Sequence, residues 1–341
     1  METKVMEAIN ESSYRVAADY LNKGEVVAFP TETVYGLGAV ATDPEAVRKI
    51  FEAKGRPSDN PLIVHIGTKE EIAQYAKDIP DVATQLMESF WPGPLTLIMN
   101  VQPGVLAANV TAGLSTVGLR MPDHPVALKL LKTVGKPVAA PSANRSGKPS
   151  PTEAEHVFHD LNGKIPAIID GGMTGIGVES TVLDVTTKIP VILRPGGVTK
   201  EMIENVIGTV SESKPFGVGE AETPRAPGMK YKHYAPDSPV YLIVPDHETI
   251  AGAIRETKAD GKKVALIGPE TFSDTGADWF FSTGALDDLK EFTKTLYAAL
   301  RACDETGADV IFAVETSREG VGAAIMNRLE KAADQKRYRK N

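Results

Sequence analysis

The sequence predicts an α/β fold divided into two domains. Short apolar runs typical of buried strands, such as 62–66 and 95–99, alternate with amphipathic stretches typical of helices. The composition changes at about residue 209, where a stretch rich in Ser, Pro, Gly, Lys and Glu shows no hydrophobic period. We therefore expect an N-terminal domain over 1–208, a linker over 209–238 and a C-terminal α/β domain over 239–341.

The strands expected in the N-terminal domain are apolar runs bounded by proline, glycine or charged residues. They cover 25–29, 62–66, 95–99, 116–122, 137–140, 167–170, 181–185 and 191–194. Amphipathic stretches predict helices over 11–22, 44–53, 69–90 with a break at Pro80, 123–134, 152–161 and 199–207. Asp43 before Pro44 is a helix start signal, and so is the capping box of Thr152 with Glu155.

The C-terminal domain repeats the same alternation. Strands are expected over 240–244, 264–267, 279–282 and 310–314, and helices over 247–258, 286–304 and from about 321. The chain ends on a basic tail, which we expect to complement the dipole of the last helix and to stay solvated; it comprises Lys331, Lys336, Arg337, Arg339 and Lys340.

Composition narrows the classes of function. The 341 residues are 42% hydrophobic and 24% charged, as in globular proteins that bury a core. No run of about 20 apolar residues and no signal-peptide pattern occurs, so we expect a cytoplasmic protein without a membrane span. The net charge of −8 argues against a protein that coats nucleic acid. Cys303 is the single cysteine and can form no internal disulfide.

Residues 36–41 match the dinucleotide-binding pattern G-x-G-x-x-G/A only by sequence. That pattern requires the glycine turn to join a strand directly to the start of a helix. Here the expected strand stops at Pro30, and the helix signals come only at Asp43 and Pro44. The pattern therefore gives weak support for a dinucleotide cofactor.

Lys54 and Arg56 precede a buried strand and are the strongest sign of an anion site. Gly55 and Pro57 disfavour helix, and side chains at i and i+2 of an extended segment project to the same side. We expect the two cations to point together at phosphate groups. The common alternative for such a pair is a solvated basic turn.

Further polar residues follow other strands. Arg120 and Arg194 end apolar runs, and Ser142 and Asn144 repeat the i, i+2 spacing with neutral side chains. The loop 171–177 holds four glycines, which either bring backbone N–H groups close to an anion or form a plain hairpin. Because loops at strand ends converge in α/β sheets, we expect a site for a polyanion and a small polar substrate.

Several catalytic motifs are missing from the sequence. There is no Walker A motif, no H-x-x-E-H zinc motif, no C-x-x-C and no G-x-S-x-G. The expected chemistry is therefore positioning and electrostatic stabilisation, without a covalent nucleophile.

Four motifs together resemble the threonylcarbamoyl-AMP synthase (YrdC-like) family in its long form: K-x-R at 54–56, S-x-N at 142–144, PTETVYGL at 30–37 and PGPLT at 92–96. The resemblance covers the whole chain. It implies an N-terminal YrdC-like domain with a twisted mixed sheet surrounded by helices, and a smaller, Rossmann-like C-terminal α/β domain. The implied activity is that of a nucleotidyltransferase, L-threonylcarbamoyladenylate synthase.

This resemblance also implies substrates and partners. L-threonine, bicarbonate and ATP with Mg²⁺ would give L-threonylcarbamoyladenylate and pyrophosphate. The product would serve the N6-threonylcarbamoyladenosine modification of tRNA through a downstream threonylcarbamoyl-transferase machinery, with a local tRNA contact on this chain as a further expectation. No metal ligand from the protein is named.

The residue roles implied by the resemblance fall into three groups. The catalytic residues are Lys54, Arg56, Ser142 and Asn144. The L-threonine residues are Thr33, His65, Arg120 and Ser180. The ATP residues are Lys54, Arg56, Asn60, Thr116, Ser142, Asn144, Ser150, Arg194 and Tyr234. For His65, a core histidine at a strand end is an equally good interpretation of the residue alone.

The linker contains KYKHY at 230–234, which a plain spacer does not need. Its tyrosines can stack on a base and its cations can meet phosphate, so we expect a lid that shields a fragile intermediate from water. Two other functions stay open. One is a non-catalytic module that binds double-stranded RNA or tRNA, and the other is a different adenylate-forming or carbamoyl-transfer enzyme.

Overall fold

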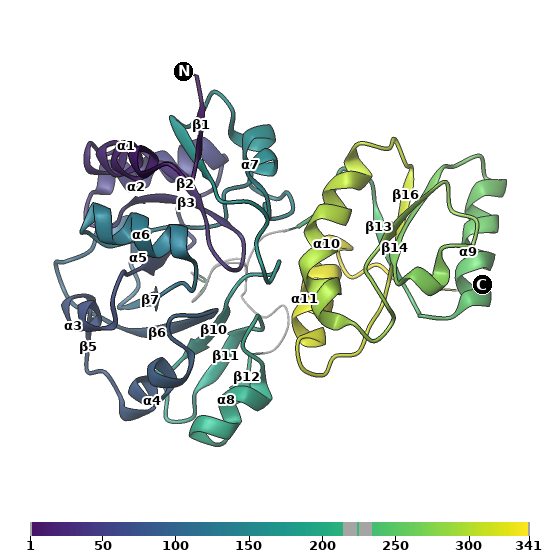
Figure 1. Ribbon diagram of the computed structural model, residues 1–341. Coiled ribbons are helices and arrows are strands. Elements are labelled where there is room, and N and C mark those ends of the chain that lie inside the picture. Colours follow the sequence, from purple (N-terminus) through teal and green to yellow (C-terminus); the bar gives the residue numbers. More distant parts are fainter. Residues whose placement is uncertain (1, 214–223, 225–233, 340–341) are drawn as a thin grey trace. The chain divides into compact units, whose positions relative to one another are not determined.

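A computed structural model describes residues 2–213, 224 and 234–339 (Figure 1). It divides the chain into two compact units. The first unit comprises Met1–Ser146, Pro151–Gly175 and Glu179–Tyr231, and the second comprises Gly147–Ser150, Ile176–Val178 and Lys232–Asn341. Most of the expected lid, at 214–223 and 225–233, lies outside the described residues.

The first unit is built on a mixed sheet of 12 strands in the order β1-β9-β2-β3-β8-β4-β7-β6-β10-β11-β12, with β5 paired to β6. The sheet contains both parallel pairs, such as β4 with β7, and antiparallel pairs, such as β6 with β7. This confirms the predicted mixed α/β fold. The strands are β1 Lys4–Glu7, β2 Val27–Pro30, β3 Tyr35–Val40, β4 Ile63–His65, β5 Ala76–Lys77, β6 Leu95–Val101, β7 Thr116–Arg120, β8 Val138–Ala139, β9 Ala167–Asp170, β10 Thr181–Asp184, β11 Val191–Arg194 and β12 Ser211–Glu212.

Helices of the first unit begin mostly where the sequence signals them. The Asp43 side chain accepts from the backbone N–H groups of Glu45 and Ala46, and Thr199 accepts from Met202. The predicted capping box at Thr152 is wrong, because that helix starts after Glu153 without a side-chain cap. The helices are α1 Glu11–Asn22, α2 Pro44–Lys54, η1 Lys69–Glu71, α3 Ile72–Tyr75, α4 Asp81–Phe90, α5 Ala108–Thr111, α6 Pro125–Val134, α7 Ala154–Leu161 and α8 Lys200–Ile207.

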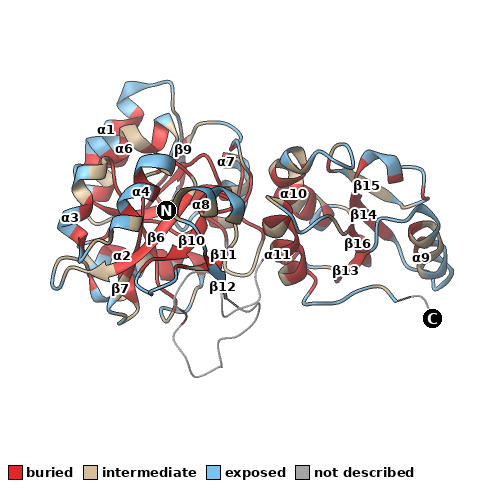
Figure 2. Ribbon diagram, turned by 90° about the horizontal axis from the view of Figure 1, so that it is seen from below, coloured by how far each residue is buried: buried red, intermediate tan, exposed pale blue. Residues whose placement is uncertain are grey.

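Alternation along the strands gives the sheet two buried faces. In β2, Val27 and Phe29 pack in one apolar cluster, whereas Ala28 between them packs in another. The first cluster includes apolar residues of α1 and α6, and the second includes those of α2, α4 and α7. Helices therefore cover both faces, and Figure 2 shows the buried strands between helices with exposed outer surfaces.

Strand β3 is the main element that the sequence did not predict. It contains the G-x-G pattern and pairs antiparallel with β2 and β8. A Cβ atom added to Gly38 would lie 2.7 Å from side-chain atoms of both Phe29 and Val138. The glycine is thus required by close packing between strands, and the pattern does not form a turn before a helix.

The second unit holds a four-stranded parallel sheet in the order β13-β16-β14-β15. In the Rossmann strand order 3-2-1-4-5-6 the first strand lies between the second and the fourth. Here the first strand of the unit, β13, is at the edge, and β16 lies between β13 and β14. The Rossmann-like detail of the prediction is therefore not confirmed. The elements are β13 Val240–Ile243, α9 His247–Ala259, β14 Val264–Gly268, η2 Glu270–Phe272, β15 Trp279–Ser282, α10 Leu289–Asp304, β16 Val310–Val314 and α11 Gly322–Ala332.

The described residues Lys336, Arg337 and Arg339 of the basic tail are exposed, as predicted, but the tail is also held by specific contacts. Tyr338 donates its backbone N–H to the carbonyl of Leu242 at 2.8 Å, so the tail pairs with β13. Arg337 forms ion pairs with Glu315 at 2.7 Å and with Glu330 at 2.8 Å. Charge pairing across the end of the sheet, which a sequence run does not reveal, fixes the tail.

Candidate active site

His65 and Arg120, both predicted to bind threonine, end neighbouring strands. His65 is the last residue of β4, Arg120 is the last residue of β7, and the parallel register pairs them directly. The carboxyl ends of parallel strands share one edge of a sheet, where binding residues gather. Both side chains are buried, with exposed fractions of 3% and 4%. The structure therefore brings these two predicted residues together.

The guanidinium of Arg120 is held on three sides. Its Nη2 lies 2.6 Å from Oε1 of Glu32, a contact at ion-pair distance but without hydrogen-bond angles. Its Nη1 donates to Oγ1 of Thr33 at 3.1 Å, and its Nε donates to the carbonyl of Gly93 at 3.3 Å. Thr33 and Arg120 thus meet, as predicted residues of one site should.

Glu32 belongs to this cluster and was not among the residues predicted from the sequence. Its carboxylate is buried beside Arg120, and a buried arginine requires a compensating charge. The signal was present, because Glu32 sits next to Thr33 in the motif that resembles the family, and Arg120 was already expected in the site. Glu32 was therefore a predictable acidic partner for Arg120.

Thr31 gives the loop that carries Glu32 and Thr33 its shape. Its hydroxyl donates to the carbonyl of Val34 at 2.7 Å, accepts from the backbone N–H of Val34 at 3.3 Å, and lies 2.8 Å from the hydroxyl of Thr33. A hydroxyl that binds the backbone a few residues on is a turn former. The loop between β2 and β3 is therefore fixed by its own side chains.

His65 is held as a neutral imidazole. Burial first, and then the charge of Arg120, lower the pKa of His65 to about 3. Its ring lies edge-on to Phe29, with centroids 6.4 Å apart, and its Nδ1 has no hydrogen-bond partner among the described residues. A neutral imidazole next to Arg120 can donate or accept a hydrogen bond but carries no charge near pH 7.

Arg194, Ser180 and Thr96 form a second polar cluster. Arg194 ends β11, and its Nε and Nη2 donate to the carbonyl of Ser180 at 3.2 and 2.9 Å. Its Nη2 also lies 3.3 Å from the Ser180 hydroxyl, which is 2.8 Å from the hydroxyl of Thr96. The predicted threonine residue Ser180 and the predicted ATP residue Arg194 are thus in direct contact.

Lys54 joins a helix end to the loop of Ser142 and Asn144. Its ammonium donates to the carbonyls of Ser142 and Asn144 at 2.5 and 2.6 Å and to Oδ1 of Asn144 at 3.2 Å. The Ser142 hydroxyl donates to the same Oδ1 at 2.6 Å. Three of the four residues predicted to be catalytic therefore form one cluster.

The predicted backbone of the K-x-R motif is wrong. Lys54 is the last residue of α2, and Gly55 follows as a left-handed cap with a φ of 61°. Glycine in this conformation ends a helix immediately after Lys54 and does not exclude the lysine from it. Lys54 and Arg56 are consequently not an extended i, i+2 pair.

Arg56 closes the following loop. Its Nη2 donates to the carbonyls of Asn60 and Pro61 at 3.2 and 3.3 Å. Asn60 is fully buried, and its side-chain amide has no hydrogen-bond partner among the described residues. A buried amide of this kind is ready to bind a polar group.

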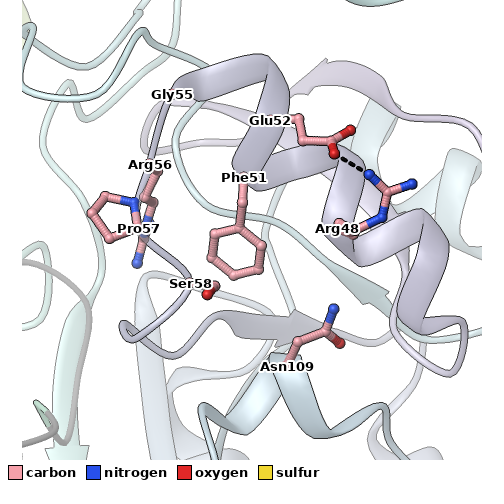
Figure 3. A pocket seen from close by; sticks show the side chains of 8 residues that line it. All are labelled: Arg48, Phe51, Glu52, Gly55, Arg56, Pro57, Ser58 and Asn109. Carbon is pink, nitrogen blue, oxygen red and sulfur yellow. Dashed lines mark hydrogen bonds and ion pairs between the residues drawn. The ribbon is translucent and has the colours of Figure 1, made fainter.

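A cavity of about 660 Å³ lies beside this loop (Figure 3). Phe51 and Arg48 of α2 face it, and Arg48 pairs with Glu52 across one helical turn. The full lining is Arg48, Phe51, Glu52, Gly55, Arg56, Pro57, Ser58 and Asn109. Among the predicted site residues, Arg56 reaches this cavity.

Three predicted residues remain: Thr116, Ser150 and Tyr234. Thr116 begins β7, opposite Asn100 of β6, whereas Arg120 ends the same strand. Ser150 and Tyr234 belong to the second unit. Both are buried, with exposed fractions of 0% and 5%.

The described part of the chain contains no group of three His, Cys, Asp or Glu side chains that could hold a metal ion. None of the helices there is both long and apolar enough to cross a membrane.

Comparison with known proteins adds to this geometry. The first unit is an α/β domain with buried arginines, hydroxyls and an amide at strand and helix ends. A family model for Sua5, YciO and YrdC, described as "Telomere recombination", matches residues 19–196. A second model, described as "Threonylcarbamoyl-AMP synthase, C-terminal domain", matches residues 198–334. The chain belongs to the Sua5–YciO–YrdC family and carries the C-terminal domain of its longer members.

Individual relatives agree over nearly the whole chain. The threonylcarbamoyl-AMP synthase of Bacillus subtilis is 52% identical over 95% of this chain and 94% of the relative. That of Pyrococcus abyssi is 50% identical over 96% of both chains. The crystal structure of P. abyssi Sua5 complexed with L-threonine superimposes with a TM-score of 0.93, at 48% identity, and covers 98% of both chains.

Proposed function

We propose that this protein makes L-threonylcarbamoyladenylate and pyrophosphate from L-threonine, bicarbonate and ATP. Relatives of half-identical sequence carry the name of this enzyme, and one was crystallised with L-threonine. The observation in this chain that supports the proposal most is the buried Arg120 with Thr33 and Glu32 beside it. A buried cation next to a carboxylate suits the two opposite charges of a free amino acid.

The threonine site uses the strand-end cluster. Arg120 takes the carboxylate of the amino acid through its planar fork, and Thr33 and Ser180 offer hydroxyls to its polar groups. Glu32 accepts from the ammonium group and gives up its own contact with Arg120 as it does so. His65 adds an uncharged hydrogen-bonding group in the same place.

The nucleotide site uses the cations and amides of the loops. Arg56 offers its guanidinium to the phosphates, and Lys54 supplies charge while it positions Ser142 and Asn144. The residues assigned to ATP are Lys54, Arg56, Asn60, Thr116, Ser142, Asn144, Ser150, Arg194 and Tyr234. ATP enters as its Mg²⁺ complex, because Mg²⁺ is commonly held by phosphates and water with few protein ligands.

The reaction has two bond-forming steps. The ammonium group of threonine first releases a proton to solvent. The resulting uncharged amine attacks the carbon of bicarbonate, and water leaves to give a carbamate. A carbamate oxygen then attacks the α-phosphorus of ATP, and the bond to the β-phosphate breaks to release pyrophosphate. Oriented cations stabilise the charge that builds up on the leaving phosphates, which is the largest contribution expected of such a site.

The product is a reactive acyl adenylate, so a later reaction must transfer its threonylcarbamoyl group to an acceptor. We assign it to the N6-threonylcarbamoyladenosine modification of tRNA by a separate threonylcarbamoyl-transferase machinery in the cytoplasm. A net charge of −8 limits any tRNA contact of this chain to a local patch.

Product identification tests the proposal. The full chain, incubated with ATP, Mg²⁺, L-threonine and ¹³C-bicarbonate, should yield labelled threonylcarbamoyladenylate in mass spectrometry, and omission of threonine should abolish it. A different adenylate would point to another adenylate-forming or carbamoyl-transfer enzyme. Salt-dependent tRNA binding without ATP consumption would favour the RNA-binding module.

A further inference from the structure

The second unit contains two short segments from the middle of the chain. Gly147–Ser150 and Ile176–Val178 group with Lys232–Asn341. Each segment is continuous with the predicted site, because Asn144 lies three residues before Gly147 and Ser180 lies two residues after Val178. Contacts that hold these segments therefore bear on residues assigned to both substrates.

Lys148 is fastened to two acidic residues of its unit. Its ammonium lies 2.6 Å from Oδ1 of Asp237 and 2.9 Å from Oδ2 of Asp304. Asp304 also accepts the backbone N–H of Asp237 at 2.6 Å through its other oxygen. The Lys148 side chain is 12% exposed and that of Asp304 is 21% exposed, so water screens this contact less than it screens a surface pair.

Two backbone contacts fix the same segment further. Arg301 of α10 donates from Nη2 to the carbonyl of Pro149 at 2.6 Å. The N–H of Ala235 donates to the carbonyl of Gly147 at 3.0 Å. Every residue from Gly147 to Pro149, immediately before the buried Ser150, thus contacts α10 or the C-terminal end of the linker.

Tyr234, the first described residue after position 224, contacts helices α10 and α11. Its ring lies 5.3 Å from that of Tyr297 of α10, and the guanidinium carbon of Arg328 of α11 lies 5.8 Å from its centroid. Its φ of 65° is rare for a tyrosine and is maintained only by surrounding contacts.

The second short segment is packed tightly on α10. A Cβ atom on Gly177 would lie 2.4 Å from the carbonyl oxygen of Thr293 and 2.5 Å from Cα of Lys294. Only glycine allows this approach, and its φ of 84° is in the left-handed region. Helix α10 therefore supports both segments that the second unit takes from the middle of the chain.

We infer that Lys148 is a positioning residue for the nucleotide site. Through Asp304 and Asp237 it ties Gly147–Ser150 to α10 and to the segment that carries Tyr234, and so sets both residues for ATP. This inference rests on the ATP roles of Ser150 and Tyr234 in the proposed function.

Three full-length variants test the inference. Lys148→Met removes the charge at similar length, Lys148→Arg retains it, and Lys262→Met changes an exposed lysine of the same unit as a control. We expect Lys148→Met to raise the KM for ATP and the Kd of a non-hydrolysable ATP analogue about tenfold, since small misplacements of binding groups have large effects. The KM for threonine should change less than about twofold.

Lys148→Arg should restore ATP binding to within about threefold of the wild type, and Lys262→Met should match the wild type. Asp304→Asn is a second, independent test. It retains an oxygen for the Asp237 N–H but loses the charge. It should therefore weaken ATP binding more than threonine binding, even if Lys148→Met folds poorly. Unchanged ATP binding in a folded Lys148→Met or Asp304→Asn, or equal losses for both substrates, would overturn the inference.

The Kd of the ATP analogue, measured by calorimetry, separates this inference from the proposed function. If the wild type binds the ATP analogue but makes no threonylcarbamoyladenylate, the proposed function fails, and the tenfold shift in Kd still tests Lys148. If the wild type makes the product and the Kd shift is missing, Lys148 has no positioning role.

Discussion

Arg120 and Lys54 are both buried cations of the predicted site, but they are held in different ways. Arg120 ends a strand and contacts the carboxylate of Glu32 and the hydroxyl of Thr33. Lys54 ends a helix and donates to two carbonyls and an amide oxygen of the Ser142–Asn144 loop. The arginine contacts side chains at a strand end, whereas the lysine crosslinks two segments through backbone carbonyls. Similar burial therefore accompanies two different kinds of contact, and the proposed roles of the two cations differ accordingly.

Lys54→Ala should break the crosslink and give the largest effect. The variant leaves buried carbonyls without their charged donor, so we expect kcat/KM to fall about 1000-fold and the free energy of unfolding to fall by about 2–4 kcal/mol. Steady-state kinetics and urea unfolding measure the two losses. A variant that lost activity at full stability would assign Lys54 to phosphate contact alone, and unchanged kcat/KM would remove it from the site.

Arg120→Lys should weaken threonine binding selectively. Lysine keeps the charge but loses the planar fork, so we expect threonine binding to weaken about 100-fold and ATP-analogue binding to change less than about threefold. Isothermal titration calorimetry with each ligand measures both. Equal losses for the two ligands would contradict a carboxylate-binding role for Arg120.

The sequence predicted strand-borne residues better than loop-borne ones. Arg120 and Arg194 were found because a charged residue directly after an apolar run lies at the end of a buried strand. Lys54 was misplaced because Gly55 has two roles that a sequence does not distinguish: it can prevent a helix, or cap one that has just ended. Only the long-range contacts with Ser142 and Asn144 settle which role applies.

The features that the sequence did not predict depend on contacts between residues far apart in the sequence. β3 was not predicted because Gly36 and Gly38 weaken any strand pattern, and the packing of Gly38 against Phe29 and Val138 appears only in the folded sheet. Glu32 and Arg120 are 88 residues apart, and a single sequence does not show which acid neutralises which base. The contacts of Lys148 with Asp237 and Asp304 were missed for the same reason.

His65 offers a test of the Arg120 environment by pH. Burial, and next the charge of Arg120, lower the pKa of folded His65 to about 3, against 6.5 for the ordinary side chain. Below pH 6.5 the unfolded chain therefore binds a proton that the folded protein does not, so the free energy of unfolding falls as the pH falls from 6.5 toward 3.

His65→Asn should remove this contribution. Between pH 6 and 5, we expect the free energy of unfolding of the wild type to fall more steeply than that of the variant, by about 1.4 kcal/mol per pH unit. Urea unfolding at half-unit steps measures both slopes, and the two curves should run parallel above pH 7.5, where neither state binds this proton. Parallel curves below pH 6 as well would contradict a neutral, buried His65.

Arg48→Ala should give the smallest effect and sets the baseline for the buried cations. Arg48 shares α2 with Lys54, but its side chain is 51% exposed and pairs with Glu45 and Glu52 on the helix surface. Exposed pairs of this kind contribute little, so we expect no measurable loss in the free energy of unfolding and a change in kcat/KM of less than about twofold. The measurements are those used for Lys54→Ala.

Because Arg48 lines the cavity that Arg56 reaches, a selective rise in the KM for ATP would extend the nucleotide site into that cavity. Burial alone would then no longer separate the cations that act on ATP from those that do not.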